Sequence, residues 1–296
     1  MYMDKTAAVI LTHNRKKLLC HCLDAVMGQK GAHCDIIVAD GGSTDGTEAL
    51  FGAEGKYPEV IYYDLGANMG SAGFYYAIRK AVTLGYENLW LMDDDVIPDD
   101  TALKQLLRAD RYLEGRWGFL VSLACWKDGS LCKANIPKNA PLRFVPVSKK
   151  QKLIPVKMAS WASIMIKAET VRKAGLPIKE YFIGTEDYEY TARISRRFPS
   201  YWVTASRVLH AKDENIKADI TKARGDRLER FYYLYRNDVH FYRKYGLQGH
   251  VYLVLKFVYT FFRIILFEKG NRNGKIKILI KGYADGFSFD PKPERI

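Results

Sequence analysis

Several features of secreted, zinc-stabilised or repetitive proteins are missing from this sequence. Residues 1–6 contain no apolar stretch of the kind that begins a signal peptide. The five cysteines are odd in number, and their irregular spacing lacks the two close pairs typical of a zinc site. Reduced thiols and a cytoplasmic setting are therefore expected. The 296 residues contain no internal repeat and no low-complexity tract, so we expect one large domain with an elaboration or two small domains.

Acidic residues are also scarce relative to basic ones. The chain has 33 Asp and Glu against 46 Lys and Arg, which gives a formal net charge of +13. Such a balance favours anionic partners, namely nucleotides, nucleic acid or an acidic membrane surface. A nucleic-acid-binding protein is one alternative at this point, although the sequence shows no RNA-recognition or helix-turn-helix signature.

The acidic residues that are present include one concentrated group, Asp93-Asp94-Asp95. It follows residues 88–92, which read as a short buried strand. Alternate residues of an extended chain point the same way, so Asp93 and Asp95 can share one target while Asp94 faces elsewhere. Hard oxygen ligands of this kind suit Mg²⁺ or Mn²⁺, which often share a site with substrate phosphates. The alternative is a solvated turn before a helix.

Strand and helix patterns alternate over the first hundred residues. Strands are predicted at residues 6–11, 35–39, 60–63 and 88–92, with helices at 14–27 and 72–84. This alternation predicts an α/β fold with a mostly parallel sheet and helices on both faces. Ligands of such sheets gather at the carboxyl ends of the strands. The polar or glycine-rich segments 12–15, 40–46 and 68–73 follow three of these strands, and the aspartate triplet follows the fourth.

Further along the chain the pattern is less regular. Strands are predicted at 117–124, 156–167 and 201–209, and a helix opened by acidic residues at 185–197. Residues 126–152 are rich in proline and lysine and predict a hairpin and a mobile loop.

Taken together, three segments resemble the glycosyltransferases of family 2, which have the nucleotide-binding fold called GT-A. The segments are residues 9–15, 38–47 and 92–95, and their order and intervals fit the family. The resemblance extends from about residue 7 to at least residue 237. It implies a catalytic GT-A domain at 1–215 and a basic, aromatic and helical extension at 216–296.

A narrower resemblance is to bacterial galactofuranosyl- and rhamnosyltransferases. It rests on residues 68–74, 160–162, 184–190 and 233–237, together with His210. The galactofuranosyltransferases match better, which implies transfer from UDP-galactofuranose to a hydroxyl of a lipid-linked or cell-surface glycan. The alternative is a rhamnosyltransferase that uses dTDP-rhamnose. Ala162 replaces the second tryptophan of a pair typical of the family, which leaves the acceptor open.

The resemblance also implies a role for individual residues around the donor. Asp93, Asp95 and His210 would hold Mn²⁺ or Mg²⁺. The nucleotide would contact Thr12, Asn14, Arg15, Asp40, Asn68, Gly70 and Asp93. Other roles remain open for some of these residues: Asp40 can brace a glycine-rich turn, Gly70 can shape a helix entrance, and His210 can be an ordinary histidine.

Asp187 would be the general base that takes the acceptor's proton, in a single displacement with inversion at the anomeric carbon. Trp161, Glu186 and Asp94 would contact the sugars. The alternatives are simple acidic charge at a helix N-terminus for Glu186 and Asp187, and core packing for Trp161. An inactive sugar-binding scaffold is a further alternative, against which the intact carboxylates argue.

Residues 251–267 are almost entirely apolar, but they include Lys256 and Arg263. A helix would place Tyr252, Lys256, Tyr259, Thr260 and Arg263 along one stripe. We therefore expect a helix that lies in a membrane surface, with the basic residues of 269–281 near anionic lipid. The alternatives are packing on the catalytic domain or on a second subunit. The expected setting is cytoplasmic and peripheral, on the inner face of a bacterial plasma membrane.

Overall fold

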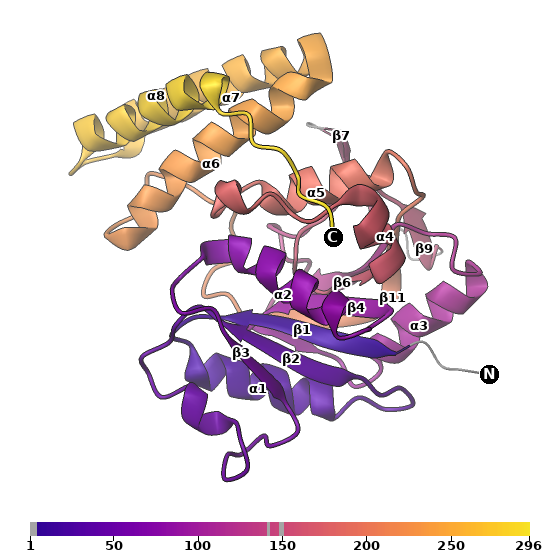
Figure 1. Cartoon of the computed structure of the whole chain (residues 1–296). Helices are drawn as coiled ribbons and strands as arrows, with labels where there is room; N and C mark the ends of the chain where they lie inside the picture. Colours follow the sequence, from indigo (N-terminus) through magenta and orange to yellow (C-terminus); the bar gives the residue numbers. More distant parts are fainter. Residues whose placement is uncertain (1–4, 141–142, 148–150) are drawn as a thin grey trace.

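The computed structural model describes residues 5–140, 143–147 and 151–296, which form one mixed sheet covered by helices (Figure 1). In spatial order the strands are β3 (Ile61–Asp64), β2 (Asp35–Asp40), β1 (Thr6–Thr12), β4 (Asn88–Asp93), β10 (Ile164–Lys167), β6 (Phe119–Cys125), β11 (Tyr201–His210) and β5 (Val96–Pro98), with β9 (Leu153–Pro155) beside β11. The first four are parallel to one another, and β6 is parallel to β11. β10 is antiparallel to both β4 and β6. The α/β fold predicted from sequence is confirmed.

The helices cover both faces of the sheet because alternate residues of each strand point to opposite sides. In β1, Ala7 and Val9 belong to one buried core, whereas Ala8 and Ile10 belong to the other. The first core is covered by α2 (Gly73–Thr83), α4 (Ala168–Ala174) and α5 (Glu186–Ser195), and the second by α1 (Lys16–Met27) and α3 (Ala102–Tyr112). Figure 1 shows α1 and α2 on opposite sides of β1, β2 and β3.

One predicted strand is shorter than expected. The sequence predicts strand structure over 156–167, but β10 begins only at Ile164. Ser163 has a left-handed backbone (φ 69°), which interrupts an extended run. Its Oγ accepts a hydrogen bond from Trp90 Nε1 at 2.8 Å, and this buried bond keeps the residue inside the core.

Several short elements connect the main ones. They are η1 (Glu48–Leu50), η2 (Gly70–Ala72), η3 (Lys179–Tyr181), η4 (Arg243–Tyr245) and a two-stranded sheet of β7 (Lys138–Ala140) and β8 (Arg143–Phe144). The antiparallel β7–β8 pair is the hairpin predicted within 126–152. Part of the mobile loop expected there, residues 148–150, lies outside the described residues.

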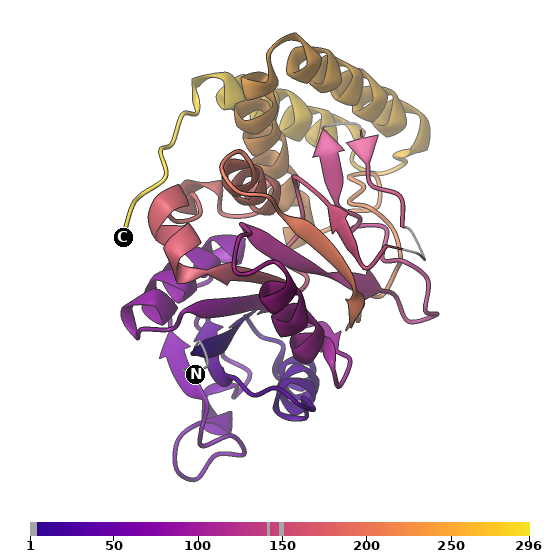
Figure 2. The same cartoon turned by 90° about the vertical axis from the view of Figure 1, so that its right-hand side faces the viewer.

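Three helices follow the sheet: α6 (Asp226–Tyr242), α7 (Gly246–Phe267) and α8 (Arg272–Ser288). They lie together above the sheet and the helices that cover it in both views (Figures 1 and 2). A Cβ on Gly282 would lie 2.8 Å from Cβ of Tyr235, and one on Gly286 would lie 2.6 Å from Cβ of Val239. These two glycines of α8 therefore permit its close approach to α6.

The polar stripe of α7 points inward, not toward headgroups or water as the sequence pattern suggested. Lys256 forms an ion pair with Asp238 of α6, and Arg263 forms one with Asp219. Thr260 is buried between them. The expected stripe is also divided, because Tyr259 is 62% exposed. Two acids beneath the helix account for this orientation, since a partly buried cation needs a partner of opposite charge.

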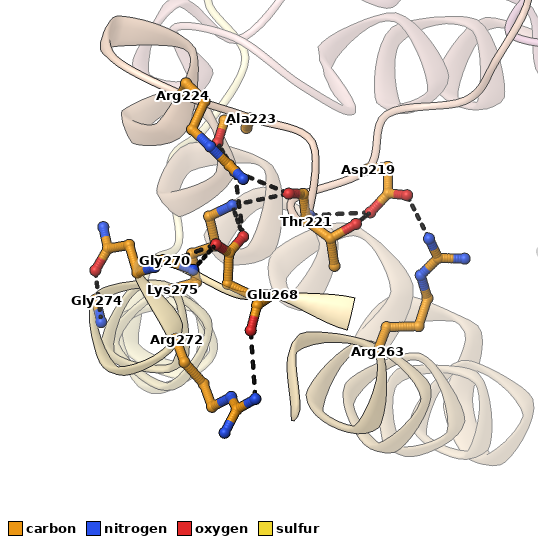
Figure 3. A network of polar contacts seen from close by, with 11 residues as sticks. Asp219, Thr221, Ala223, Arg224, Arg263, Glu268, Gly270, Arg272, Gly274 and Lys275 are labelled. Carbon is orange, nitrogen blue, oxygen red and sulfur yellow. Dashed lines mark hydrogen bonds and ion pairs between the residues drawn. The ribbon is translucent and has the colours of Figure 1, made fainter. Parts of the chain in front are cut away.

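A buried ion pair closes the turn between α7 and α8 (Figure 3). Glu268 and Lys275 are paired, and both side chains are fully buried. Glu268 Oε1 also accepts a hydrogen bond from the backbone of Gly270 at 2.8 Å, and Lys275 Nζ donates to the carbonyl of Thr221 at 3.0 Å. The Lys275 partner and two backbone donors lower the pKa of Glu268 to about 2. This network ties the α7–α8 turn to the segment before α6.

Candidate active site

Three parallel strands end at the same edge of the sheet and bring the predicted nucleotide-binding residues together. Thr12 is in register with Asp40 of β2, and Leu11 is in register with Asp93 of β4. Because parallel strands place their carboxyl ends at one edge, the loops that follow β1, β2 and β4 share one site. The tertiary structure therefore gathers three segments that are far apart in the sequence.

Asp94 is held by the last residue of β1 and by the loop that follows this strand. Its Oδ2 accepts a hydrogen bond from Thr12 Oγ1 at 2.8 Å, and its Oδ1 accepts one from Arg15 Nη1 at 3.1 Å. Arg15 Nη1 also donates to Asp95 Oδ2 at 3.1 Å. Burial raises the pKa of Asp94 to about 6, although the charge of Arg15 opposes the shift. The guanidinium of Arg15 thus donates hydrogen bonds to two carboxylates. Its side chain is 44% exposed, so an anion from solvent can reach it.

Asp95, in the turn after β4, contacts His210 of β11, and Asp93 at the end of β4 is near enough for its charge to act on both. His210 ends β11, and its Nε2 lies 3.1 Å from Asp95 Oδ1. That oxygen is buried and accepts no well-aligned hydrogen bond among the described residues. A buried acceptor without a well-aligned hydrogen bond is costly and favours a nearby positive charge. Two carboxylates and an imidazole are also donors that Mn²⁺ accepts, so these residues fit a divalent cation in chemical type.

The electrostatics of these three residues show how strongly they interact. Burial, assisted by the charge of Asp95, raises the pKa of Asp93 to about 7. Burial acts in the same direction on Asp95, but contact with His210 outweighs it and lowers the pKa of Asp95. His210 itself is buried, yet its acidic neighbours raise its pKa to about 9. Within the described residues no three His, Cys, Asp or Glu side chains form a complete metal-binding group, and His210 is turned onto Asp95.

Asn135 orients His210, although no pattern in the sequence indicates this role. Its Oδ1 lies 2.8 Å from His210 Nδ1, and its Nδ2 donates to Ser160 Oγ at 2.6 Å. An amide oxygen can only accept, so Nδ1 carries the proton of that contact and Nε2 faces Asp95. Partners of this kind orient metal-binding histidines. Asn135 lies in the irregular segment 126–152, where no periodic pattern marks single residues.

Both carboxylate oxygens of Asp40 already accept hydrogen bonds, one from its own turn and the other from β3. Oδ1 accepts hydrogen bonds from the backbone N and the Oγ of Ser43, at 3.0 and 2.6 Å, and Oδ2 accepts one from the Tyr62 hydroxyl at 2.9 Å. Asp45 caps the next turn, where it accepts from Thr47 Oγ1 at 2.6 Å. The bracing role that the sequence left open is therefore present, and nucleotide contact by Asp40 stays a prediction.

The loops that carry Asn14, Asn68 and Gly70 lie against neighbouring loops. Asn14 Oδ1 accepts a hydrogen bond from the backbone N of Thr44 at 2.7 Å, which joins the loops after β1 and β2. Asn68 Oδ1 accepts one from the backbone N of Gly70 at 2.8 Å. Gly70 has a φ of +53°, and a Cβ there would lie 2.6 Å from the carbonyl oxygen of Phe182. Only glycine allows this approach without a shift of the backbone.

Glu186 and Asp187 form the first turn of α5, where acidic side chains are favourable to the helix dipole. Burial raises the pKa of Glu186 to about 8, and Glu186 Oε2 has no hydrogen-bond partner among the described residues. Burial also raises the pKa of Asp187, to about 6, although its Oδ1 accepts a bond from the backbone N of Tyr188 at 2.6 Å. Burial thus favours the neutral form of both acids, and the nearby charge of Asp187 adds to this effect on Glu186. Their environments give different pKa values to two chemically similar carboxyl groups.

Trp161 lies in the core of this structure. Its ring centroid is 4.9 Å from that of Phe74 and 5.7 Å from that of Tyr190, and the residue is 3% exposed. Its Nε1 is buried without a partner among the described residues. Core packing, the alternative role left open by the sequence, is what these contacts show. A sugar contact for Trp161 stays a prediction.

Comparisons with known proteins identify the family. Residues 7–111 match the model described as glycosyl transferase family 2. Galactofuranosyltransferase GlfT1 of Mycolicibacterium smegmatis is 25% identical over 218 residues, which cover 66% of this chain and 67% of that protein. The chain is a glycosyltransferase with a family 2 domain at residues 7–111.

Solved structures establish the GT-A fold of this family 2 enzyme. Residues 1–349 of S. aureus TarS superpose with a TM-score of 0.54 at 16% identity, covering 97% of this chain and 72% of that one. GalNAc-T7 superposes with a TM-score of 0.60 at 15% identity, covering 97% of this chain and 56% of that one. At these identities the likeness concerns the fold alone.

Lys138 is a second residue near the candidate site that no pattern in the sequence indicates. It belongs to β7, is 7% exposed, and places Nζ 4.2 Å from the centroid of the Tyr188 ring. Burial lowers the pKa of Lys138 to about 8. Its positive charge opposes the effect of burial on Asp187 and favours the ionised form of that acid. A lysine in an irregular segment is usually solvated, so only the tertiary structure reveals this contact.

The N-terminus of α5 is also tied to the C-terminal helices. Thr185 precedes the two acids and donates a hydrogen bond from Oγ1 to Asp238 Oδ1 at 2.7 Å. Asp238 is 2% exposed and is paired with Lys256 of α7. The segment that carries the predicted base is therefore connected to α6 and α7 through a buried polar chain.

Proposed function

We propose that this enzyme transfers galactofuranose from UDP-galactofuranose to a hydroxyl group of a lipid-linked or cell-surface glycan. The 25% identity to galactofuranosyltransferase GlfT1 over 218 residues is the observation that carries the choice of sugar. Proteins of similar fold support the choice of a uridine nucleotide donor. TarS was crystallised with UDP and with UDP-GlcNAc, and GalNAc-T7 with UDP, GalNAc and Mn²⁺.

The donor would lie at the carboxyl edge of β1, β2 and β4. Arg15 is exposed on one side and already faces carboxylates, so it is suited to meet a phosphate of the donor. Thr12, Asn14, Asp40, Asn68, Gly70 and Asp93 would complete the nucleotide site. Asp40 would hold a base or ribose group only by exchanging one of its present contacts with Ser43 or Tyr62.

Asp93, Asp95 and His210 would hold Mn²⁺ or Mg²⁺ beside the diphosphate. When bound, the cation supplies Lewis-acid stabilisation of the negative charge that develops on the leaving group. Asn135 holds the His210 ring through Nδ1 and so presents Nε2 to the site. The buried Asp95 Oδ1, which lacks a well-aligned hydrogen bond, supports this assignment.

Asp187 would act as the general base. Its carboxylate would take the proton of the acceptor hydroxyl while the acceptor oxygen forms a bond to the anomeric carbon and the bond to the nucleotide diphosphate breaks. One such displacement inverts the anomeric carbon. A base with a pKa near 6 is ionised at neutral pH and still accepts a proton effectively.

Glu186, Asp94 and Trp161 would orient the sugars. Because its pKa is about 8, the Glu186 carboxyl is largely protonated at neutral pH and can donate a hydrogen bond to a sugar oxygen. Asp94 would accept from a sugar hydroxyl in place of Thr12 or Arg15. We further propose that residues 1–215 are the catalytic domain and that 216–296 are an extension, in a cytoplasmic protein bound to the inner face of a membrane.

The choice of donor is tested by donor hydrolysis with the full chain. We expect Mn²⁺-stimulated release of UDP from UDP-galactofuranose, and much slower release of dTDP from dTDP-rhamnose. Faster hydrolysis of dTDP-rhamnose would overturn the proposed sugar and favour the rhamnosyltransferase alternative. Hydrolysis of neither donor, in protein whose circular dichroism is that of a folded chain, would contradict both.

A further inference from the structure

The outward face of α7 is apolar from Val251 to Phe267, beyond the exposed Gln248 and His250 of its first turns. Large apolar side chains that are at least 44% exposed cover this face. They are Leu247, Val251, Val254, Leu255, Val258, Tyr259, Phe262, Leu266 and Phe267. The helix spans 22 residues from Gly246 to Phe267 and contains no Asp or Glu. Exposed apolar patches of this extent mark a site of interaction.

The same helix directs its lysine and its arginine toward acids within the protein. Lys256 is paired with Asp238, and Arg263 is paired with Asp219. A helix on a water-exposed surface has the opposite arrangement, with apolar residues inside and charges outside. The inverted arrangement of α7 uses both of its cations for internal pairs, so no charge interrupts the outer face. This organisation suits a face whose surroundings are apolar.

The surroundings of this face are strongly basic. From residue 239 to residue 284 the sequence contains one acid, Glu268, and that side chain is fully buried in its pair with Lys275 (Figure 3). Exposed cations in the same stretch include Lys269, Arg272 and Lys277. The exposed charge of this part of the chain is therefore positive, which complements anionic lipid headgroups.

We propose that the outer face of α7 inserts into one leaflet of an anionic membrane, with the helix lying in the plane of the interface. A stretch of 18 residues within 227–267 is apolar enough to cross a bilayer, by length and composition alone. However, the inward face of α7 packs on α6 through Asp238 and on the preceding segment through Asp219. A spanning helix would carry these buried acids into the hydrocarbon layer, whereas an interfacial helix keeps them within the protein.

A second copy of the chain is a less suitable occupant of this face. A symmetric pair would bring the same surface of both chains together, and with it the same basic residues. Lys269, Arg272 and Lys277 would then approach their own copies without an exposed acid between residues 239 and 284 to compensate. An anionic leaflet supplies the compensating charge together with an apolar interior.

Membrane docking would give the proposed enzyme access to a lipid-linked acceptor, and in that respect it rests on the proposed function. Vesicle binding is measured without donor or acceptor, so docking and catalysis can fail independently. The assay is flotation of the full chain with phosphatidylcholine vesicles, with and without phosphatidylglycerol. We expect binding to the anionic vesicles, weaker binding to pure phosphatidylcholine, and partial loss at high salt because headgroup attraction is screened.

The decisive variant is Leu255→Glu/Phe262→Glu, which places two acids on the outer face. We expect vesicle binding to weaken by about tenfold or more, because two large side chains no longer leave water. Tyr112→Glu is the matched control, since Tyr112 is an apolar side chain on α3 that is 79% exposed. Wild-type-like binding by the double variant, or an equal loss in the control, would overturn the proposal.

A Phe262→Trp variant tests the same face without adding charge. Insertion predicts a blue shift of tryptophan emission with anionic vesicles and no shift with buffer alone. Light scattering in the absence of vesicles tests the alternative, in which a second copy of the chain covers this face. A stable dimer that the double variant dissociates, together with unshifted emission in the presence of vesicles, would replace the membrane with a second copy.

Discussion

His210 Nε2 and Asp95 Oδ1 lie 3.1 Å apart, at the meeting point of β11 and the segment that follows β4. The contact favours the charged form of each partner, lowering the pKa of Asp95 and raising that of His210 to about 9. An imidazolium beside carboxylates supplies the kind of positive charge that a divalent cation would supply. A bound cation and a proton on Nε2 are therefore expected to compete for this position.

This competition predicts metal-dependent donor binding. In calorimetric titrations at pH 8, UDP is expected to bind at least about tenfold more tightly with Mn²⁺ than without it. Asp95→Asn removes one proposed ligand charge and is expected to abolish most of that difference. Asp128→Asn, on a carboxylate outside the candidate site, is the control and should retain it. Equal UDP affinity with and without Mn²⁺ in the wild-type chain would contradict the metal assignment.

Asp187→Asn is expected to reduce kcat by about 10²–10⁴-fold, because an amide cannot accept the acceptor's proton. The substitution keeps the size of the side chain, so the melting temperature should change little. Glu169→Gln, which alters an exposed carboxylate on α4, is the matched control and should leave kcat unchanged. A loss of less than threefold in initial rates with UDP-galactofuranose would remove Asp187 from the role of base.

The pH dependence of kcat reports on the same carboxylate. A base whose pKa is about 6 is protonated at lower pH, so kcat should rise as the pH increases through that value. Lys138 favours the ionised form of Asp187, and Lys138→Met should therefore move this acidic limb to higher pH. Lys127→Met, an exposed lysine of the same segment, is the control. A limb that stays in place in Lys138→Met would show that Lys138 does not influence the base.

Removing the cation of the α6–α7 ion pair is expected to destabilise the fold. Lys256→Met leaves the 2%-exposed Asp238 without its charged partner. Loss of one member of a buried pair typically costs about 3–5 kcal/mol, measured as the free energy of unfolding in urea. Asp238→Asn/Lys256→Met removes both charges and should be less destabilised than Lys256→Met alone. A double variant that is the less stable of the two would mean that the pair's charge is not what holds these helices together.

Much of the fold was accessible from local patterns. The strands β1, β2 and β4 lie within one residue of their predicted bounds, because short apolar runs between polar segments have few other structures available. The alternation of these strands with α1 and α2 was sufficient to predict a sheet covered on both faces. The antiparallel insertion of β10 was not predictable, since register and direction depend on contacts with β4 and β6.

The residues of the candidate site were predictable from the sequence, but the contacts that they make in the structure were not. Position after a strand placed Thr12, Asp40 and Asp93 at one edge. No local sequence pattern indicates that Asp40 accepts a hydrogen bond from Tyr62 or that Asn135 lies beside His210. Such contacts join residues far apart in the chain, and a single sequence contains no signal for them.

The sequence by itself determined which chemical groups occur and where they lie along the chain. These are an aspartate triplet after an apolar strand, acids at a helix start, and an apolar helix near the end. Tertiary structure decided which groups those residues meet and which way each one faces. The polar stripe of α7 is the clearest case, because its spacing is local but its inward orientation depends on Asp238 and Asp219 lying beneath it. Periodicity specifies which side chains share a face, whereas the burial of opposite charges elsewhere in the fold selects the face that is turned to the outside.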